Sequence, residues 1–267
     1  MCDKDFCTLY SLFMLALARK ELSACSFRLF IGEKPLLPQT IEDLSTEVTE
    51  DELNEAFIDE WGVKYSKDGR KLLKAPQGLK GKYSVKVGTR IISAHAFWNC
   101  SFLSNIVIPN SVANIGDGAF RGCCFLNKVV IPDSVISIRI DAFHGCRSLS
   151  SVVIPDSVTS IGFGTFNGCS SLSSVVIPNS VTSIGISSFE GCSSLVSVVI
   201  PDSVTSIGAC AFQNCSSLSN IVFPDSVTSI GEGAFANCNI PYYLKQELIS
   251  RFGDELFRLS LPIILTI

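Results

Sequence analysis

The amino-acid sequence predicts a repeat solenoid built from short parallel β-strands, because three residue types recur every 23 residues along a chain of 267. Phenylalanine keeps this step seven times from Phe97 to Phe235, and isoleucine seven times from Ile92 to Ile230. Seven cysteines share it: Cys100, Cys123, Cys146, Cys169, Cys192, Cys215 and Cys238. One unit cannot bury its apolar face alone, so successive units must stack and equivalent side chains must form columns.

Composition narrows the class of protein. The chain is 47% hydrophobic and 17% charged, which excludes a disordered chain. The formal net charge of −4 gives no electrostatic footprint for nucleic acid. Five further cysteines show no metal-ligand spacing, and the sequence predicts neither a metal nor a cofactor: Cys2, Cys7, Cys25, Cys124 and Cys210.

Each repeat is predicted to form one coil of the solenoid, and the fourth repeat shows the pattern well. Leu172, Val175 and Ile177 point inward along a first strand, and Pro178 ends it because proline cannot donate to a ladder. A second inward segment follows at 181–184, and a tight helical or 3₁₀ turn before the cysteine closes the coil. From about residue 85 to 240 these coils form the predicted solenoid.

One position in each coil reports backbone geometry. The residue before each column cysteine is always glycine or asparagine, so we expect a left-handed residue with positive φ there. The glycine that follows each column isoleucine is replaced by Ser93 and Arg139 in two coils, which argues against an obligatory positive φ.

The column cysteines are expected to be buried, unpaired thiols, since parallel neighbours have poor disulfide geometry. Cys124 and Cys210 fall outside the column and are expected to be more exposed and able to react. His144 lies near Cys146, but that cysteine belongs to the column, so we predict no thiol catalysis and no enzyme.

An acidic or amide residue follows the proline in each of six coils: Asn110, Asp133, Asp156, Asn179, Asp202 and Asp225. Stacked carboxylates could bind calcium. Side-chain capping of the turn explains the row more simply, because asparagine substitutes freely and serine always follows.

The chain should be capped at both ends. In residues 41–84, Thr49 and Glu52 predict a capping box that opens a helix through about Trp61, and Asp68-Gly69 predicts a β-hairpin between 63–66 and 70–73. The nine acids between 42 and 60 form either a solvated helix or, less simply, an acidic binding site. In residues 241–267, Pro241 should open a helix with Leu244, Leu248 and Phe252 on one face and Gly253 at its end.

Two segments leave alternatives open. Residues 1–40 are irregular, and their apolar stretch at 6–18 reads as a weak export signal or as a short packed or frayed helix. That stretch is too short to cross a bilayer. The apolar tail at 259–267 either docks on the cap or is exposed.

The outward positions of the first strand form two stripes. One stripe is apolar: Val107, Val130, Val153, Val176, Val199 and Val222. Beside it runs a small polar stripe: Asn105, Lys128, Ser151, Ser174, Ser197 and Asn220. Valine suits any strand, so β-propensity alone could explain the first stripe. A contiguous exposed apolar stripe, however, is typical of an interaction site.

The motif from Phe223 to Cys238 resembles the BspA-like, or Treponema-type, leucine-rich-repeat family, whose pattern is Ile-Pro-Asp-Ser-Val-Thr-Ser-Ile-Gly-x-x-Ala-Phe-x-x-Cys. The resemblance covers 85–238. It implies a right-handed curved solenoid with a parallel sheet on its concave face, and roles in adhesion or protein recognition without catalysis. It also implies a secreted or cell-surface protein, with a cytoplasmic location as the alternative.

The sequence therefore predicts a non-enzymatic module that binds a protein or peptide through the concave face. The alternative is a structural spacer or self-associating repeat without a specific ligand. Carbohydrate binding is a third option that lacks support, because the stripes hold no aromatic platform and Trp98 lies on the turn side.

Overall fold

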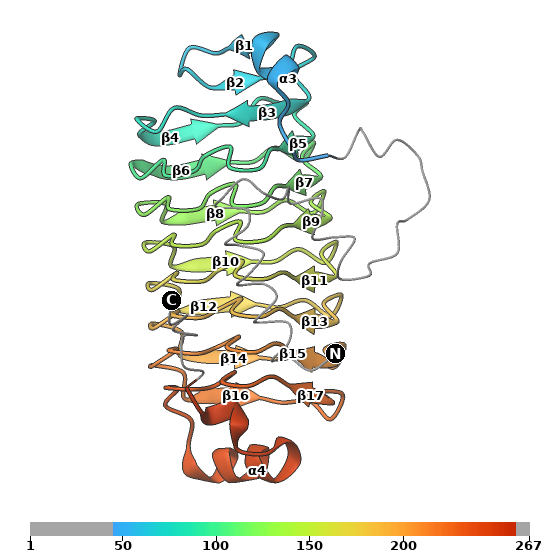
Figure 1. The fold of residues 1–267 in the computed structure, drawn as a ribbon, viewed down its shortest axis with the longest axis vertical. Helices are drawn as coiled ribbons and strands as arrows, with labels where there is room; N and C mark the ends of the chain where they lie inside the picture. The colour runs from blue at the N-terminus through green and yellow to red at the C-terminus, as the bar shows by residue number, and fades with distance from the viewer. Residues whose placement is uncertain (1–44, 260–267) are drawn as a thin grey trace, which may run out of the picture. The chain divides into compact units, whose positions relative to one another are not determined.

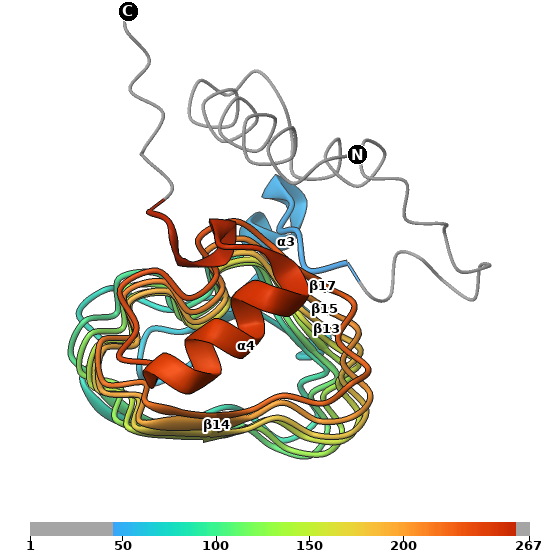
Figure 2. The same cartoon turned by 90° about the horizontal axis from the view of Figure 1, so that it is seen from below.

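The chain forms a stack of short coils, seen in a computed structural model that describes residues 45–259 (Figure 1). The expectations for residues 1–40 and for the tail after Leu259 lie outside these residues. Each coil contributes one strand to each of two parallel ladders, which lie on different sides of the coil (Figure 2). The solenoid predicted from the repeat is confirmed.

The first ladder carries the two predicted stripes. Its strands are β4 (Gly81–Ser84), β6 (Leu103–Val107), β8 (Lys128–Val130), β10 (Ser151–Val153), β12 (Ser174–Val176), β14 (Ser197–Val199) and β16 (Asn220–Val222). Equivalent residues pair across the coils, so that Val153 of β10 lies beside Val176 of β12. Hydrogen bonding divides this ladder into the groups β4-β6-β8, β10-β12 and β14-β16. The sheet expected from the repeat is thus three short sheets in series.

The second ladder consists of two-residue strands, apart from its first strand. Its strands are β3 (Lys71–Lys74), β5 (Ile91–Ile92), β7 (Asn114–Ile115), β9 (Ser137–Ile138), β11 (Ser160–Ile161), β13 (Ser183–Ile184), β15 (Ser206–Ile207) and β17 (Ser229–Ile230). Pairing is interrupted once, between β9 and β11. Arg139 follows β9 at the position where most coils have glycine, and its Nε contacts Asp117 Oδ1 of the preceding coil over 3.3 Å.

The tight turns provide a third and unbroken ladder. The N–H groups of His95, Phe97 and Asn99 donate to carbonyls of the next coil over 2.7–2.8 Å. The alternate residues in the same turn bond within the turn, as Cys100 N does to Phe97 O over 3.0 Å. Equivalent inter-coil bonds continue to the last coil, where Phe235 N donates to Leu256 O. The turns therefore join coils where the strand ladders are interrupted.

The phenylalanine and cysteine columns fill the core. All seven column phenylalanines are fully buried, and neighbouring rings stack with centroids 5.0–5.5 Å apart. Each thiol from Cys123 to Cys238 donates to the carbonyl of the phenylalanine 26 residues earlier, over 3.1–3.3 Å. No disulfide forms among the nine cysteines of residues 45–259, as predicted for the column. Cys124 and Cys210 are half-buried.

The left-handed residue before each cysteine is confirmed in all seven coils, with φ between 57° and 75°. A second left-handed column was not predicted from the sequence. Its members have φ between 52° and 68° and are His95, Gly118, Asp141, Gly164, Ser187, Cys210 and Gly233. Residue type varies along this column, so no single-residue pattern marks it.

The predicted side-chain capping by the acidic and amide row is wrong. These six residues lie in turns and are exposed, but no described residue forms a hydrogen bond with their side chains. The serine that follows makes the contact instead. Ser134 Oγ donates to Val112 O over 2.7 Å and Ser180 Oγ to Val158 O over 2.7 Å, each reaching the preceding coil.

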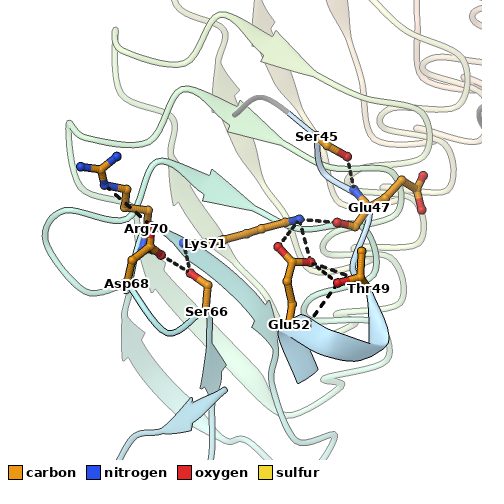
Figure 3. Close-up of polar contacts among 8 residues, drawn as sticks. All are labelled: Ser45, Glu47, Thr49, Glu52, Ser66, Asp68, Arg70 and Lys71. Carbon is orange, nitrogen blue, oxygen red and sulfur yellow. Dashed lines mark hydrogen bonds and ion pairs between the residues drawn. The ribbon is translucent and has the colours of Figure 1, made fainter. Parts of the chain in front are cut away.

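The N-terminal cap begins with α3 (Glu50–Asn54), whose capping box between Thr49 and Glu52 forms as predicted. The helix is shorter than expected, because β1 (Phe57–Ile58) follows and pairs with β2 (Lys64–Tyr65). The predicted hairpin is present, since β2 pairs antiparallel with β3. Lys71 of β3 reaches across to α3, where its Nζ contacts Glu52 Oε1 over 2.9 Å and the Glu47 carbonyl (Figure 3).

The C-terminal cap is the helix α4 (Tyr242–Phe252), which starts after Pro241 and ends at Gly253 with φ of 90°. Leu248 is buried, while Leu244 and Phe252 pack against the core from one face. The 3₁₀ helix η2 (Glu255–Phe257) supplies the carbonyls that end the turn ladder. Within residues 45–259, no helix is long and apolar enough to cross a membrane.

Candidate binding face

The outward surface of the first ladder, from β4 to β16, is called the strand face below. Its six valines are all exposed, with relative exposures of 42% for Val107, 64% for Val130, 62% for Val153, 57% for Val176, 62% for Val199 and 53% for Val222. Between them, the inward residues of the same strands are at most 9% exposed. A change at an outward valine therefore leaves the core untouched.

The polar stripe lies on the same face. Lys128, Ser151, Ser174, Ser197 and Asn220 are exposed, and Asn105 is half-buried. Parallel pairing in register sets Ser151 beside Ser174 and Val153 beside Val176. The strand face thus presents a row of apolar side chains next to a row of mostly short polar ones, in which Lys128 is the long charged member.

An aromatic pair stands at the corner before this face. Phe102 and Phe125 precede β6 and β8, are 62% and 58% exposed, and stack with ring centroids 6.2 Å apart. The pair was not predicted from the sequence. The available signal was a departure from the repeat, because the equivalent position in the next four coils is serine.

A cleft lies at the N-terminal end of the strand face. It has a volume of about 460 Å³ and is lined by Asp59, Glu60, Trp61, Lys82, Ser84 and Lys86. Trp61 is 53% exposed and forms an apolar wall. The cleft was not predicted from the sequence, because β4 and the loop between β1 and β2 form it together.

A chain of hydrogen bonds fixes the floor of the cleft. Tyr65 and Tyr83 share a bond of 2.6 Å, and the Tyr83 hydroxyl donates to Asp59 Oδ2 over 2.6 Å. Asp59 Oδ1 accepts from the N–H groups of Trp61 and Val63. Burial raises the pKa of both tyrosines, so they are neutral donors at ordinary pH. The Asp59 carboxylate is therefore held in place by three donors.

The residues considered for catalysis or metal binding lie elsewhere. Cys146 Sγ donates to Phe120 O over 3.2 Å inside the core, and His144 Nδ1 lies 3.5 Å from Asp141 Oδ1 on the turn side. Burial raises the pKa of the Cys146 thiol well above its ordinary value, which disfavours the thiolate that nucleophilic attack requires. No cluster of three or more potential metal ligands occurs in residues 45–259.

Comparison with known proteins agrees with this architecture. Residues 90–200 and 182–263 match a family profile described as the BspA type leucine rich repeat region, in six copies. A leucine-rich repeat protein of Eubacterium ventriosum is 30% identical over 74% of this chain and 53% of its own, with a TM-score of 0.66. One from Bacteroides ovatus is 32% identical over 69% of this chain and 48% of its own, with a TM-score of 0.62.

A third similar structure is the leucine-rich repeat protein of Treponema pallidum, which is 28% identical over 80% of this chain and all of its own, with a TM-score of 0.65. The chain spans about half the length of the Eubacterium and Bacteroides proteins. No curated protein sequence matches the chain.

Proposed function

The chain belongs to the BspA-type leucine-rich-repeat family, and on that premise we propose that it is a protein-binding module whose partner docks on the strand face. Solenoids of this kind are typically non-enzymatic binding scaffolds. Adhesion is the use that the family resemblance implies.

The exposed valine stripe is the observation that supports this proposal. Six β-branched side chains, each at least 42% exposed, lie in one row over successive coils. An exposed apolar row of this extent, rimmed by polar residues, is typical of a protein interaction site. The neighbouring serines add hydrogen-bonding groups without bulk, so an extended partner segment can approach the strands closely.

The test replaces two central valines with glutamate, as Val153→Glu and Val176→Glu together. Full-length wild-type and variant chains are immobilised and exposed to protein extracts of the producing cell and of candidate host cells. Because both side chains point outward, the melting temperature of the double variant should change by only a few degrees. The variant should no longer bind the proteins that the wild-type chain retains from the extracts. An unfolded double variant would place these valines in the core and contradict the assignment.

Ile136→Glu is the matched control. Ile136 is 53% exposed and precedes β9, on the second ladder rather than on the strand face. This variant should keep both its stability and its retained proteins. If it loses the same proteins as the valine variant, the partner recognises exposed apolar residues in general. Light scattering of the wild-type chain and both variants tests the self-associating alternative. If the wild-type chain is an oligomer and only the valine variant is a monomer, the partner is a second copy of the chain.

A further inference from the structure

The N-terminal end of the strand face carries a charge pattern unlike the rest of the molecule. Residues 61–90 contain nine lysines and arginines and one acid, Asp68, within a chain whose net charge is −4. Two of these lysines, Lys82 and Lys86, line the cleft beside Trp61. Lys128 extends the positive charge along the polar stripe.

Both cleft lysines are available to an outside anion. Within residues 45–259, neither forms an ion pair. Lys82 is exposed. Lys86 Nζ lies 4.3 Å from the centre of the Phe57 ring and 5.2 Å from that of Tyr65, so the aromatic rings hold this ammonium group at the cleft.

The two acids of the cleft differ in what they contribute. Asp59 is held by the Tyr83 hydroxyl and by two backbone N–H groups, so its oxygens are already satisfied. Glu60 is exposed and has no described partner. Its charge therefore opposes an incoming anion. Removal of this charge should strengthen anion binding, whereas removal of a lysine should weaken it.

The backbone of β4 adds a second means of recognition. The N–H groups of Gly81 and Val85 donate to Phe102 O and Val107 O of the next coil. Because direction alternates along a parallel strand, the N–H groups of Lys82 and Ser84 face the opposite edge. β4 ends its ladder, so this edge has no strand partner among the described residues. An unpaired edge of this kind can accept an extended peptide as an added strand.

We propose that this cleft binds an extended acidic peptide segment, which lies along the free edge of β4 with its carboxylates on Lys82 and Lys86. The proposal deepens the binding function proposed above and rests on it. In this proposal, an acidic segment at one end of the partner binds the cleft, and the rest of the partner contacts the apolar stripe. A nucleic acid is disfavoured, because its phosphate backbone has no amide groups with which to pair along the free edge of β4 as an added strand.

The experiment uses the full chain and a fluorescein-labelled eight-residue peptide of alternating glutamate and valine. Fluorescence anisotropy at 20 mM and 150 mM salt measures its affinity beside that of a peptide with glutamine for each glutamate. The acidic peptide should bind about tenfold more tightly at low salt, and the advantage should shrink at high salt. Equal binding of the two peptides would overturn the proposal.

Variants locate the site. Lys82→Gln should weaken the acidic peptide about fivefold, and Glu60→Gln should strengthen it about threefold, because each removes one exposed charge close to the ligand. Lys74→Gln is the matched control, since Lys74 is exposed on β3 and does not line the cleft. If the Lys82 variant is unstable, Lys86→Gln replaces it and should also weaken binding of the acidic peptide. Identical effects of the Lys74 and Lys82 changes would contradict a defined site.

Two more probes separate the possible failures. A peptide with proline at its second and third valines should bind at least fivefold more weakly, because proline has no N–H group to donate to the strand edge. Single-stranded DNA that matches the acidic peptide in affinity would overturn the assignment to peptide. If Val153→Glu with Val176→Glu loses its retained proteins while no cleft variant changes peptide binding, the inference fails and the proposed function stands.

Discussion

At the scale of single residues, the glycine that follows each column isoleucine keeps neighbouring coils close. A Cβ atom on Gly208 would lie 2.5 Å from Ile186 N, and one on Gly231 would lie 2.3 Å from Ala209 N. Gly162 differs, because its nearest neighbour would be Thr165 Oγ1 at 3.5 Å. The preceding coil carries Arg139 at this position, and the strands β9 and β11 of the two coils do not pair. None of these three glycines has a positive φ.

The glycine column therefore predicts unequal effects of one substitution. Gly208→Ala should lower the free energy of unfolding by about 1–3 kcal/mol, because backbone atoms must move apart. Gly162→Ala should be neutral or stabilise by up to about 1 kcal/mol, because alanine restricts the unfolded chain and its Cβ would meet no backbone atom closer than 3.7 Å. Thermal and urea denaturation of the two variants measures the difference. Equal losses of unfolding free energy would show that the effect depends on the position in the repeat and not on the space around the added Cβ atom.

The cysteine column predicts a loss of stability at alkaline pH. Burial raises the pKa of the Cys169 thiol to about 12 and that of Cys100 to about 11, against an ordinary value of 9.0. The neutral thiol is the form that the fold keeps, so this contribution is complete below pH 9 and is lost as the pH rises toward 12. Each such thiol steepens the decline by about 1.4 kcal/mol per pH unit.

Cys169→Ala isolates one thiol of that column. The small cavity lowers stability at every pH, but the slope between pH 9 and 11 should become shallower by about 1.4 kcal/mol per unit. Urea denaturation across this range provides the measurement. An unchanged slope would mean that Cys169 does not titrate with unfolding.

Residue identity also explains what could be read from the sequence and what could not. The column before each cysteine accepts only glycine and asparagine, so its left-handed backbone was predictable and is confirmed. The second left-handed column contains Asp141 and Ser187, whose conformation depends on neighbours in adjacent coils. Asp141 Oδ2 contacts Arg121 Nη1 over 2.6 Å from one coil to the next. Such contacts are visible only once the stack is known.

At the scale of elements, local rules predicted where segments begin better than where they end. Thr49 and Glu52 fix the start of α3, but strand pairing by β1 stops the helix at Asn54. Alternation along the first strand predicted the exposed stripes of the strand face, because each side chain follows a period of two. The cleft was not predictable, since the loop at 59–61 meets β4 only through the N-terminal cap.

The turns, rather than the strands, give the stack its continuity. Strand pairing is interrupted between β8 and β10, between β12 and β14, and between β9 and β11. At all three interruptions the turn bonds persist, as when Phe143 N donates to Thr165 O over 2.9 Å. The left-handed residues make this possible, because they let alternate N–H groups point to the next coil.

At the scale of the whole molecule, stability should depend on register and on the number of coils. Each coil contacts mainly its two neighbours, so the removal of one complete unit should remove one interface and leave the rest intact. Deletion of 173–195 joins Leu172 to Val196 and keeps every column in line, because 23 residues are lost. The shorter chain should fold with a melting temperature lower by several degrees, measured by circular dichroism and calorimetry.

Deletion of 173–193 provides the control for register. It removes nearly as much chain, but it shifts the later columns by two residues, so phenylalanine and cysteine no longer continue their stacks. This variant should lose most of its cooperative unfolding. Equal melting temperatures for the two deletions would contradict a stack held by aligned columns. The in-register deletion also separates the two proposed contacts, because it removes Val176 from the stripe while the cleft at Lys82 and Lys86 stays whole, so the acidic peptide should bind it as tightly as the full chain.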